Sequence, residues 1–478
     1  MSRDVLRQLP PVNSVLQQRE LDPLRNTYSR EVLVRAVQAA LEEARLSLRD
    51  GQSAVLEACL LARRAREILQ GRKPSLRRVI NATGILLHTG LGRAPLAEEA
   101  VQAVATVARG YCNLEFKLEE GDRGQRTLGV AALLREITGA EAATVVNNNA
   151  GATVLALRAL AAGREVVVSR GQLVEIGGSF RLPEIFEVSG ARLREVGTTN
   201  KTRLADYAAA ISPDTAVILR VHHSNYQIVG FTEEAPLGDL IRLAHEHGLV
   251  LIDDIGSGAL APGLPPGLRN EPHVAEGIVK GADLVLFSGD KLLGGPQCGV
   301  LVGTSAVVRR IESDPLMRAL RVDKMTLAAL EATLLLIRDT RQGGPRIPFW
   351  RMLSLSLPDL AARAERFATS LRDELNLDAR VTESESFIGG GSAPVQPIPS
   401  VVVQVYPPYP APFDSEAAWA KALRMGEPPV VPRVTRGVVV FDFRTVESSE
   451  EPNLLDAIRR TCQDQGPSLG LNGPPRER

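Results

Sequence analysis

The stretch ADLVLFSGDKLLGGP (residues 282–296) is the most informative part of this sequence. Its first half is typical of a buried strand, and this strand ends in Ser-Gly-Asp-Lys before a Gly-Gly-Pro turn. A lysine at the end of a core strand is poorly placed for solubility alone, and the flanking glycines let a large ligand approach the backbone. A lysine held away from water has a lowered pKa and can form a Schiff base with an aldehyde. Lys291 is therefore a candidate nucleophile, and the alternative is a surface lysine in a turn.

The segment LIDDIGSG (residues 251–258) ends a second apolar strand with two acids. A carboxylate beside the pyridine nitrogen of pyridoxal phosphate (PLP) keeps the ring protonated, so that the ring accepts electrons from a substrate carbanion. Asp253 and Asp254 are both candidates for this partner, and strand geometry points them in opposite directions. The alternative is an aspartate that binds magnesium or caps a helix.

Two further strand ends carry small polar residues. The segment VVNNNAGAT (residues 145–153) reads as a strand, a turn and an Ala-rich helix, whose N-terminal N–H groups and dipole suit a phosphate. The segment VHHSNY (residues 221–226) offers hydrogen-bond donors for a cofactor hydroxyl, although a histidine in such a place is more often structural. We therefore expect PLP contacts at Ser288, Asn148, Asn149, Ser224 and Asn225.

Between these motifs, short β-branched runs alternate with helical patterns from Val79 onward. This alternation predicts βαβ units and a mostly parallel, doubly wound α/β sheet, with functional loops at the carboxyl ends of its strands. The expected strands are Ala143–Val146, Glu165–Ser169, Ala216–Val221, Leu249–Asp253, Leu284–Ser288 and Gly299–Val302.

The segment before this sheet, residues 1–75, is predicted to be a helical, basic domain. Apolar residues recur at helical spacing after Ser29, a plausible N-cap. They are Leu33, Val37, Leu41, Ala44 and Leu48. A second helix is expected from about Ser53 to Leu69, with Arg63, Arg64 and Arg66 on its outer face. Residues 1–78 hold 15 Lys and Arg against 9 Asp and Glu, a net charge of about +6, which suits a polyanion, whereas the alternative is an ordinary solvated helix face.

The region after the catalytic segment (76–345) is expected to form a small α+β domain over residues 346–464. A helix from about Pro358 to Leu375 should precede a long loop that contains Gly389-Gly390-Gly391 and Pro394, Pro397 and Pro399. Strands are expected at Ser400–Val405 and Gly437–Phe443. The Gly/Pro-rich residues 465–478 are expected to be disordered.

Composition excludes several classes of protein. The 478 residues have zero formal net charge, with 44% hydrophobic and 23% charged residues, as in globular proteins. The four cysteines are widely spaced, which argues against a disulfide framework or a zinc site and favours the reducing cytoplasm. We expect no metal, no signal peptide and no membrane span.

Long stretches in conserved order make the chain resemble the bacterial selenocysteine synthases, the L-seryl-tRNA(Sec) selenium transferases. They include VINATGILLHTGLGRAPL, YCNLEFKLEEGDRGQR, SRGQLVEIGGSFRLP, FSGDKLLGGPQCG and MRALRVDKMTLAALEATL, and the resemblance covers nearly the whole chain. It implies a fold-type I PLP-dependent transferase with its cofactor on Lys291, and it favours Asp254 over Asp253. Two departures are Gln125 and Cys112, where the family usually has serine.

The resemblance also assigns an anion site and partners. It implies that Arg93, Arg318 and Arg321 bind the selenium donor, selenophosphate. Arg318 and Arg321 are three residues apart, so on a helix they would share one face and pair their guanidiniums for a phosphate-like anion. The N-terminal domain would contact tRNA, and the family's large homo-oligomer would be a decamer.

The implied activity is conversion of seryl-tRNA(Sec) to selenocysteinyl-tRNA(Sec). β-Elimination of the serine hydroxyl would give an aminoacrylyl intermediate, to which selenium adds. The rivals are a PLP-dependent lyase or aldolase of the same fold that acts on a small amino acid, and a relative that uses another nucleophile or aminoacyl substrate. A non-catalytic tRNA-binding protein is a third rival, but it leaves the surroundings of Lys291 unexplained.

Overall fold

The computed structural model describes residues 9–49, 57–70, 75–176, 180–223, 225–260, 268, 271–340, 346–407, 413–435 and 437–463. The chain divides into two compact units, Met1–Arg78 and Val79–Arg478. Ser224, an expected cofactor contact, and the C-terminal residues 465–478 lie outside the described residues. In the described part of the chain, no helix is both long enough and apolar enough to cross a membrane, and no cluster of His, Cys, Asp or Glu could hold a metal ion.

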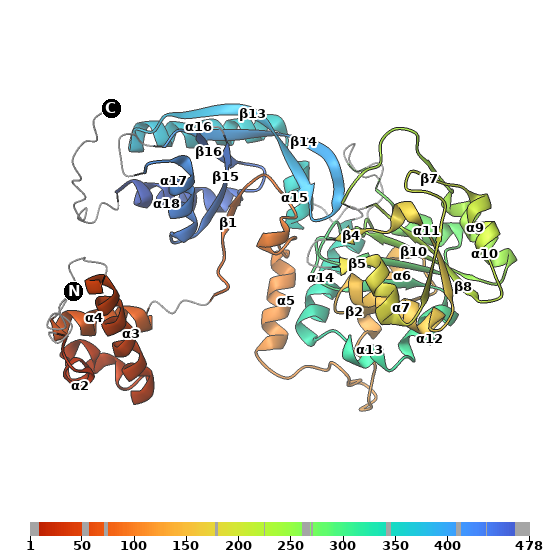
Figure 1. Ribbon diagram of the computed structural model, residues 1–478, viewed down its shortest axis with the longest axis horizontal. Helices are drawn as coiled ribbons and strands as arrows, with labels where there is room; N and C mark the ends of the chain where they lie inside the picture. The colour runs from red at the N-terminus through yellow and green to blue at the C-terminus, as the bar shows by residue number, and fades with distance from the viewer. Residues whose placement is uncertain are drawn as a thin grey trace. The chain divides into compact units, whose positions relative to one another are not determined.

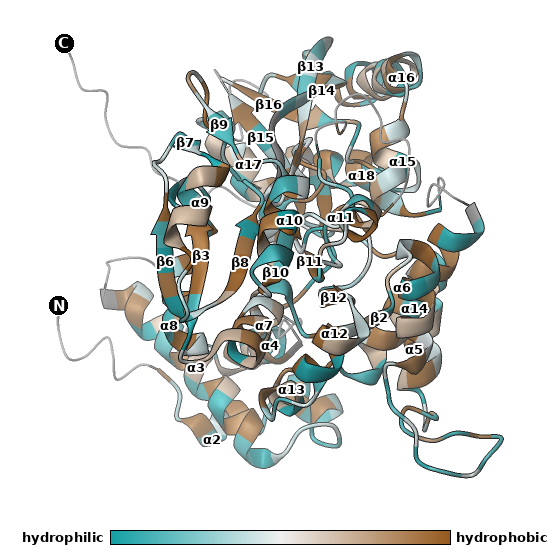
Figure 2. Cartoon of the chain, turned by 90° about the vertical axis from the view of Figure 1, so that its right-hand side faces the viewer, coloured by the Kyte–Doolittle hydropathy of each residue, from teal (hydrophilic) through white to brown (hydrophobic). Residues whose placement is uncertain are grey.

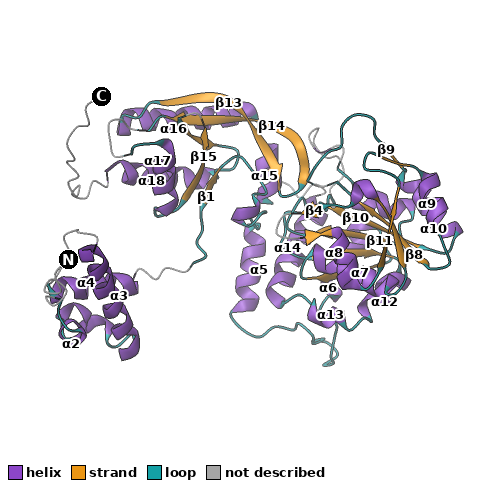
Figure 3. Ribbon diagram, viewed as in Figure 1, coloured by secondary structure: helices purple, strands orange, loops and turns teal. Residues whose placement is uncertain are grey.

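In the described part of the first unit, the regular elements are all helices (Figure 3). Its elements are α2 (Val12–Leu16), η1 (Arg19–Leu24), α3 (Arg30–Arg49) and α4 (Ala58–Gln70). All five apolar positions predicted for α3 are buried, and four of them, all except Leu48, belong to one core, so the predicted helix is confirmed. The start of the second helix was predicted too early, because Glu57 stands outside α4 and its carbonyl accepts the first-turn hydrogen bond from Leu61.

The second unit is built on a seven-stranded sheet (Figure 1). Its strand order is β2-β12-β11-β10-β8-β3-β6, and only β12 runs antiparallel to its neighbours. The bounds are β2 (Ala142–Val146), β3 (Glu165–Ser169), β6 (Arg192–Val196), β8 (Thr215–Val221), β10 (Val250–Gly256), β11 (Leu284–Ser288) and β12 (Gly299–Gly303). The predicted doubly wound, mostly parallel sheet is therefore confirmed.

The bounds of the six expected strands differ from their predicted bounds by at most three residues, whereas β6 was not predicted. In β6 the exposed arginines Arg192 and Arg194 interrupt the apolar pattern. This strand lies at the edge of the sheet and pairs with one strand only, β3, so part of it faces solvent. Edge strands commonly carry charge, which discourages pairing with other chains.

Helices cover both faces of this sheet, and apolar strands lie between them (Figure 2). On one face, α6 (Leu128–Thr138), α10 (Leu237–Glu246), α11 (Val274–Lys280) and α14 (Lys324–Thr340) pack on one core cluster. On the other face, α7 (Asn149–Ala161), α8 (Leu182–Ser189) and α12 (Ser305–Glu312) pack on a second cluster. Two-sided burial explains why the central strands are continuous apolar runs.

A five-stranded sheet has the order β1-β15-β16-β14-β13. Its strands are β1 (Ile80–Ala82), β13 (Ala379–Gly389), β14 (Ser392–Val405), β15 (Val430–Thr435) and β16 (Val438–Asp442). With α16 (Leu357–Leu375), α17 (Glu416–Met425) and α18 (Glu451–Gln463) it encloses its own core. β1 pairs with β15, so the segment expected to begin the catalytic domain also contributes a strand to this sheet.

The predicted long loop around Gly389–Gly391 is wrong. β13 and β14 form a long antiparallel hairpin, and the three glycines turn the chain with φ of 66° to 74°. Prolines cannot donate a ladder hydrogen bond and are usually excluded from strands. Here β14 pairs with β16 only over Val402–Val405, so Pro397 and Pro399 lie where β14 has a single neighbour.

Candidate active site

A cavity of about 490 Å³ lies at the carboxyl ends of β8, β10 and β11, beside the N-terminus of α7. This is the edge of an open α/β sheet at which ligands bind. Six of the residues singled out in the sequence line it together: Lys291, Asp254, Ser288, Asn148, Asn149 and Arg93. They come from four separate segments of the chain, so the fold brings together what the sequence keeps apart.

Lys291 reaches this position because the chain folds back sharply after β11. The N–H of Gly289 donates to the backbone carbonyl of Cys298. A Cβ at Gly289 would lie 2.5 Å from the Cys298 sulfur. Gly294 has a φ of +72° and donates to the carbonyl of Lys291. Glycine is required at both places, because a side chain would clash at the first and be strained at the second.

The Lys291 amine is buried in this cavity, with only 4% of the residue exposed. Burial lowers its pKa, and the positive charge of Arg93 acts in the same direction. Among the described residues Nζ has no hydrogen-bond partner. A neutral, unhindered amine is the form that reacts with an aldehyde.

Asp253 and Asp254 point in opposite directions, as strand geometry predicts. Asp254 lines the cavity and accepts hydrogen bonds from Asn149 Nδ2 and Thr153 Oγ1, each at 2.9 Å. Burial raises the pKa of Asp254, although both hydrogen bonds and the charge of Lys291 act against it. Asp253 instead forms an ion pair with Arg220 at 2.8 Å and does not line the cavity.

The N-terminus of α7 contributes to the wall of the cavity. Asn148 caps this 13-residue helix, since its Oδ1 accepts from the Gly151 N–H at 2.7 Å. Gly299 lets β12 approach closely, because a Cβ there would lie 2.3 Å from the Asn148 carbonyl. Ser288 lines the same cavity, so a phosphate would meet helix N–H groups and a hydroxyl together.

Arg93 and Asp290 also line the cavity. Their ion pair measures 2.7 Å, and Arg93 has the left-handed φ of 62° that is rare for any residue except glycine. Arg93 Nε and Asp290 Oδ1 are buried without hydrogen-bond partners in the described part of the chain. A guanidinium with an unused donor at a cavity wall is a suitable anchor for an anion.

Arg318 and Arg321 do not share a helix face, so that prediction is wrong. The helix α13 (Leu316–Ala319) ends before Arg321, which forms a bridge with Val146 of β2 instead. Both side chains are exposed, and neither lines the cavity in this chain. Their turn nevertheless lies beside the site, because the Leu320 carbonyl accepts from the Asn147 N–H at 2.9 Å.

Asn225 is also absent from the cavity wall, and its amide donates to the Glu175 carbonyl at 2.7 Å. Two site residues were not assigned a role from the sequence. Thr153 holds Asp254, and its spacing of four residues after Asn149 placed both on one helix face. Asp290 holds Arg93 and directly precedes Lys291.

The residues of the cavity fit PLP. A buried amine, a buried carboxylate and a helix N-terminus correspond to the aldehyde, the pyridine nitrogen and the phosphate of that cofactor. Asn149 Oδ1 is a further buried atom without a partner among the described residues, so the site has spare hydrogen-bonding capacity for a polar ligand.

Comparisons with known proteins agree with this geometry. The profile of a family described as "L-seryl-tRNA selenium transferase" matches residues 79–447, and one described as "Selenocysteine synthase N terminal" matches residues 6–45. A protein of Geobacter sulfurreducens named L-seryl-tRNA(Sec) selenium transferase is 44% identical over 95% of this chain and 99% of its own length. One of Moorella thermoacetica with the same name is 46% identical over 96% and 97%.

Among solved structures, D-glucosaminate-6-phosphate ammonia-lyase superposes with a TM-score of 0.55. It is 20% identical and covers 83% of this chain and 98% of its own. At this identity the likeness shows the fold alone, which is the fold-type I α/β architecture expected for the chain.

Proposed function

The chain belongs to the L-seryl-tRNA selenium transferase family, and we propose from this membership and from its cavity that it converts seryl-tRNA(Sec) to selenocysteinyl-tRNA(Sec) with selenophosphate as the selenium donor. The observation that carries the proposal is the buried Lys291 amine in one cavity with the buried carboxylate of Asp254. A binding protein has no need of that pair.

PLP is the proposed cofactor. Lys291 would hold its aldehyde carbon, Asp254 its pyridine nitrogen, and Ser288, Asn148 and Asn149 its phosphate. When bound, PLP supplies an electron sink for the carbanion at the serine Cα. Thr153 and Asn149 position Asp254 through their hydrogen bonds, so that its carboxylate holds the proton on the ring nitrogen.

Lys291 is proposed as the acid and base of the reaction. Once the serine amine has taken its place at the cofactor, the released Lys291 amine, whose lowered pKa favours the neutral form, would remove the proton from the serine Cα. The resulting ammonium returns that proton to the serine hydroxyl, which leaves as water in the β-elimination. Selenium from selenophosphate would then form a bond to Cβ while Cα takes up a proton, and water would attack phosphorus, so that the Se–P bond breaks and phosphate is released.

The donor would bind at Arg93, whose Nε is unused at the cavity wall. Arg318 and Arg321 are exposed on a turn that is hydrogen-bonded to the start of the Asn147–Asn149 segment. We assign them to the donor site of the assembled protein, a large homo-oligomer such as a decamer, in which a neighbouring subunit covers this turn.

The basic unit of residues 1–78 is the proposed tRNA contact, since cationic surfaces bind nucleic-acid phosphates. The protein would act in the cytoplasm, where aminoacyl-tRNA is found. Seryl-tRNA carries its serine as an ester, so no arginine is needed to clamp a free carboxylate, and Arg93 is available for the donor anion.

The test is reconstitution of the full chain with PLP, seryl-tRNA(Sec) and radioactive selenophosphate. Labelled selenocysteinyl-tRNA(Sec) is the expected product. A PLP-loaded protein that eliminates water from free serine but leaves seryl-tRNA(Sec) unchanged would instead be a lyase for small amino acids.

A further inference from the structure

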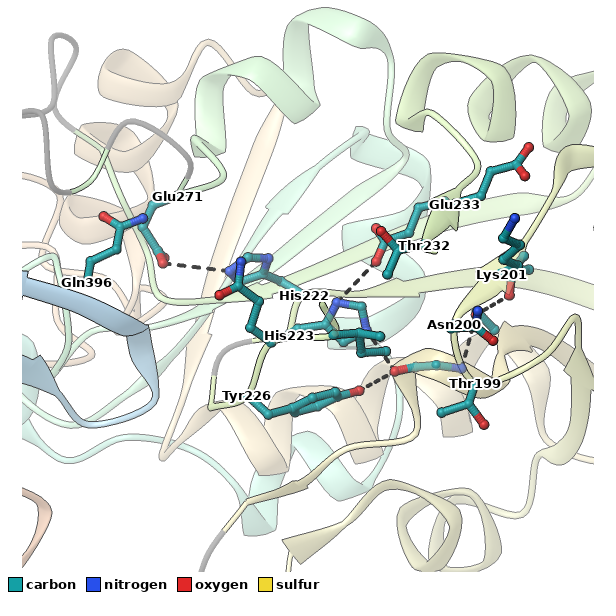
Figure 4. Close-up of a pocket in the computed structure, with 16 residues that line it drawn as sticks. Thr199, Asn200, Lys201, His222, His223, Tyr226, Thr232, Glu233, Glu271 and Gln396 are labelled. Carbon is teal, nitrogen blue, oxygen red and sulfur yellow. Dashed lines mark hydrogen bonds and ion pairs between the residues drawn. The ribbon is translucent and has the colours of Figure 1, made fainter. Parts of the chain in front are cut away.

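A second cavity, of about 420 Å³, adjoins the cavity of Lys291, and Figure 4 shows the residues that line it. His222 lines both cavities, so its imidazole is their common wall. The other walls come from the ends of β3 and β8, from β14, and from the short parallel pair β7 (Lys201–Thr202) and β9 (Glu233–Glu234). None of the steps proposed above uses this space.

The charges of the second cavity disfavour an anion. Glu233, Glu234 and Glu271 line it, against one lysine, Lys201, and two histidines. Glu234 lies 3.2 Å from Nδ1 of His223; burial acts to lower the pKa of His223, but this carboxylate outweighs it and raises that pKa. Glu233 is paired with Arg203 at 3.0 Å, but the other two carboxylates would repel selenophosphate or a tRNA phosphate, whereas carboxylates accept hydrogen bonds well from hydroxyl groups.

Two buried polar atoms in these walls have no hydrogen-bond partner among the described residues. They are Gln396 Oε1 on β14 and His222 Nε2 after β8, and the latter lies 3.8 Å from a carboxylate oxygen of Glu271 (Figure 4). Buried polar atoms are nearly always partnered, so the unpartnered Gln396 Oε1 in the wall of this cavity points to a polar ligand.

An aromatic ring completes the cavity. The hydroxyl of Tyr226 donates to the Gly171 carbonyl, which also faces His223 Nε2 at 2.7 Å (Figure 4). The rings of Tyr226 and His223 meet edge to face at 4.9 Å between centroids. These contacts fix the Tyr226 ring in the wall, and a fixed ring is a surface on which a nucleobase can stack.

We propose that this second cavity binds the 3′-terminal nucleoside of the aminoacyl-tRNA, an inference that rests on the proposed function. The serine of that substrate is esterified to the terminal ribose, so the nucleoside must lie next to the cavity where the serine Cα meets Lys291. The shared wall at His222 satisfies this requirement. Tyr226 stacks on the base, Gln396 Oε1 accepts from a base amino group or a ribose hydroxyl, and the carboxylates accept from ribose hydroxyls.

The experiment uses the PLP-loaded full chain and adenosine, the nucleoside that ends tRNA. Adenosine should compete with seryl-tRNA(Sec) and bind measurably in calorimetry, whereas inorganic phosphate should not displace it. Tyr226→Leu and Gln396→Leu should each raise KM for seryl-tRNA(Sec) and weaken adenosine binding by roughly tenfold, with a much smaller change in kcat. Tyr226→Phe keeps the ring and should bind adenosine like the parent.

Gln102→Leu is the matched control, because Gln102 is exposed on α5 (Glu98–Ala108) and lines neither cavity. It should leave KM and adenosine binding unchanged. PLP absorbance and the melting temperature show whether each variant is folded; if a leucine variant is not, Gln396→Ala and Tyr226→Ala take its place with the same expected losses.

Three outcomes would overturn the assignment. One is an unchanged KM in both leucine variants while the parent converts seryl-tRNA(Sec). Another is adenosine inhibition that does not compete with seryl-tRNA(Sec), as for a regulatory site for free nucleotide. The third is adenosine binding that survives Tyr226→Leu. If instead the parent shows no turnover, the proposed function fails, and calorimetry with Tyr226→Leu and Tyr226→Phe still decides whether the cavity binds a nucleoside.

Discussion

Asp253 and Asp254 are neighbours in β10, yet they meet different surroundings. The first faces Arg220 inside the protein, and the second faces the cavity and two donors from α7. Because side chains alternate along a strand, one residue of register separates a structural ion pair from the proposed cofactor contact. Both acids are buried, so burial alone would not distinguish them.

Asp254→Asn should lower kcat by about 10²–10⁴-fold with little change in stability, because a neutral amide cannot hold the ring proton. Asp253→Asn should do the reverse. It leaves Arg220 without its carboxylate and should cost about 1–3 kcal/mol of unfolding free energy, with activity retained. Single-turnover rates and urea unfolding of both variants check this, and a crippled Asp253→Asn beside a mild Asp254→Asn would reverse the assignment.

Lys291 should be the only residue to which borohydride fixes PLP. The parent should absorb visible light, and digestion after reduction should give one labelled peptide that contains Lys291. Lys291→Ala should lose both the label and turnover. A labelled peptide from elsewhere in the chain would contradict this assignment and would show that another lysine, such as Lys201 in the neighbouring cavity, holds PLP.

At the scale of elements, the turn after β11 is what places Lys291. Gly294 packs against Ile347, which is fully buried, and a Cβ at Gly294 would lie 2.4 Å from Ile347 Cγ2. Gly92 has a comparable positive φ, but no atom lies within 4 Å of its Cβ position. A substitution at Gly92 would therefore cause backbone strain alone, whereas a substitution at Gly294 would cause both strain and a steric clash.

Gly294→Ala should cost about 2–4 kcal/mol of unfolding free energy and reduce PLP occupancy, because strain and clash add and displace Lys291. Gly92→Ala should cost only about 1 kcal/mol, the strain alone. Chemical unfolding and cofactor absorbance of both variants provide the comparison. Equal losses would mean that the contact with Ile347 is relieved by a small shift.

Sequence patterns predicted the helices and strands whose own apolar residues mark them as buried. They failed to predict elements whose conformation depends on a partner strand that is distant in the chain. The strand ends that carry Lys291 and Asp254 could be found, because apolar runs and glycines mark them. The hairpin of β13 and β14 could not, since its prolines are tolerated only where β16 stops. The turn of Arg318 and Arg321 was read as a helix because its pairing with Val146 is contributed by β2, far away in sequence.

That turn carries a prediction of its own. Arg318→Ala and Arg321→Ala should each raise KM for selenophosphate by roughly 10–100-fold, as for a lost hydrogen bond to a charged group, without changing PLP absorbance or seryl-tRNA(Sec) affinity. Arg309→Ala, an exposed arginine on α12, is the control. Equal loss of donor and tRNA binding would indicate that these arginines only stabilise the turn, since Arg321 also lies 3.8 Å from Glu115.

At the scale of the whole molecule, charge is divided between the two compact units. Residues 1–78 carry about +6 while the whole chain is neutral, so the remainder is acidic by the same amount. The first unit has its own apolar core, and the described residues that line the cavity of Lys291 all belong to the second unit. If the first unit binds the tRNA body as proposed, this binding and the chemistry on the terminal serine should be separable by mutation.

A chain that begins at Val79 should keep PLP but lose salt-sensitive binding of tRNA(Sec), because the cationic surface is gone. Within the full chain, Arg63 and Arg64 provide a sharper comparison. Arg64 is already paired with Glu43 and Glu67, whereas Arg63 has no acidic partner among the described residues. Arg63→Ala should lower the slope of log affinity against log salt by about one, and Arg64→Ala should change it less. Filter binding across a salt series measures both slopes. Full-strength, salt-sensitive binding by the shortened chain would move the tRNA site to the acidic unit and contradict the division of tasks.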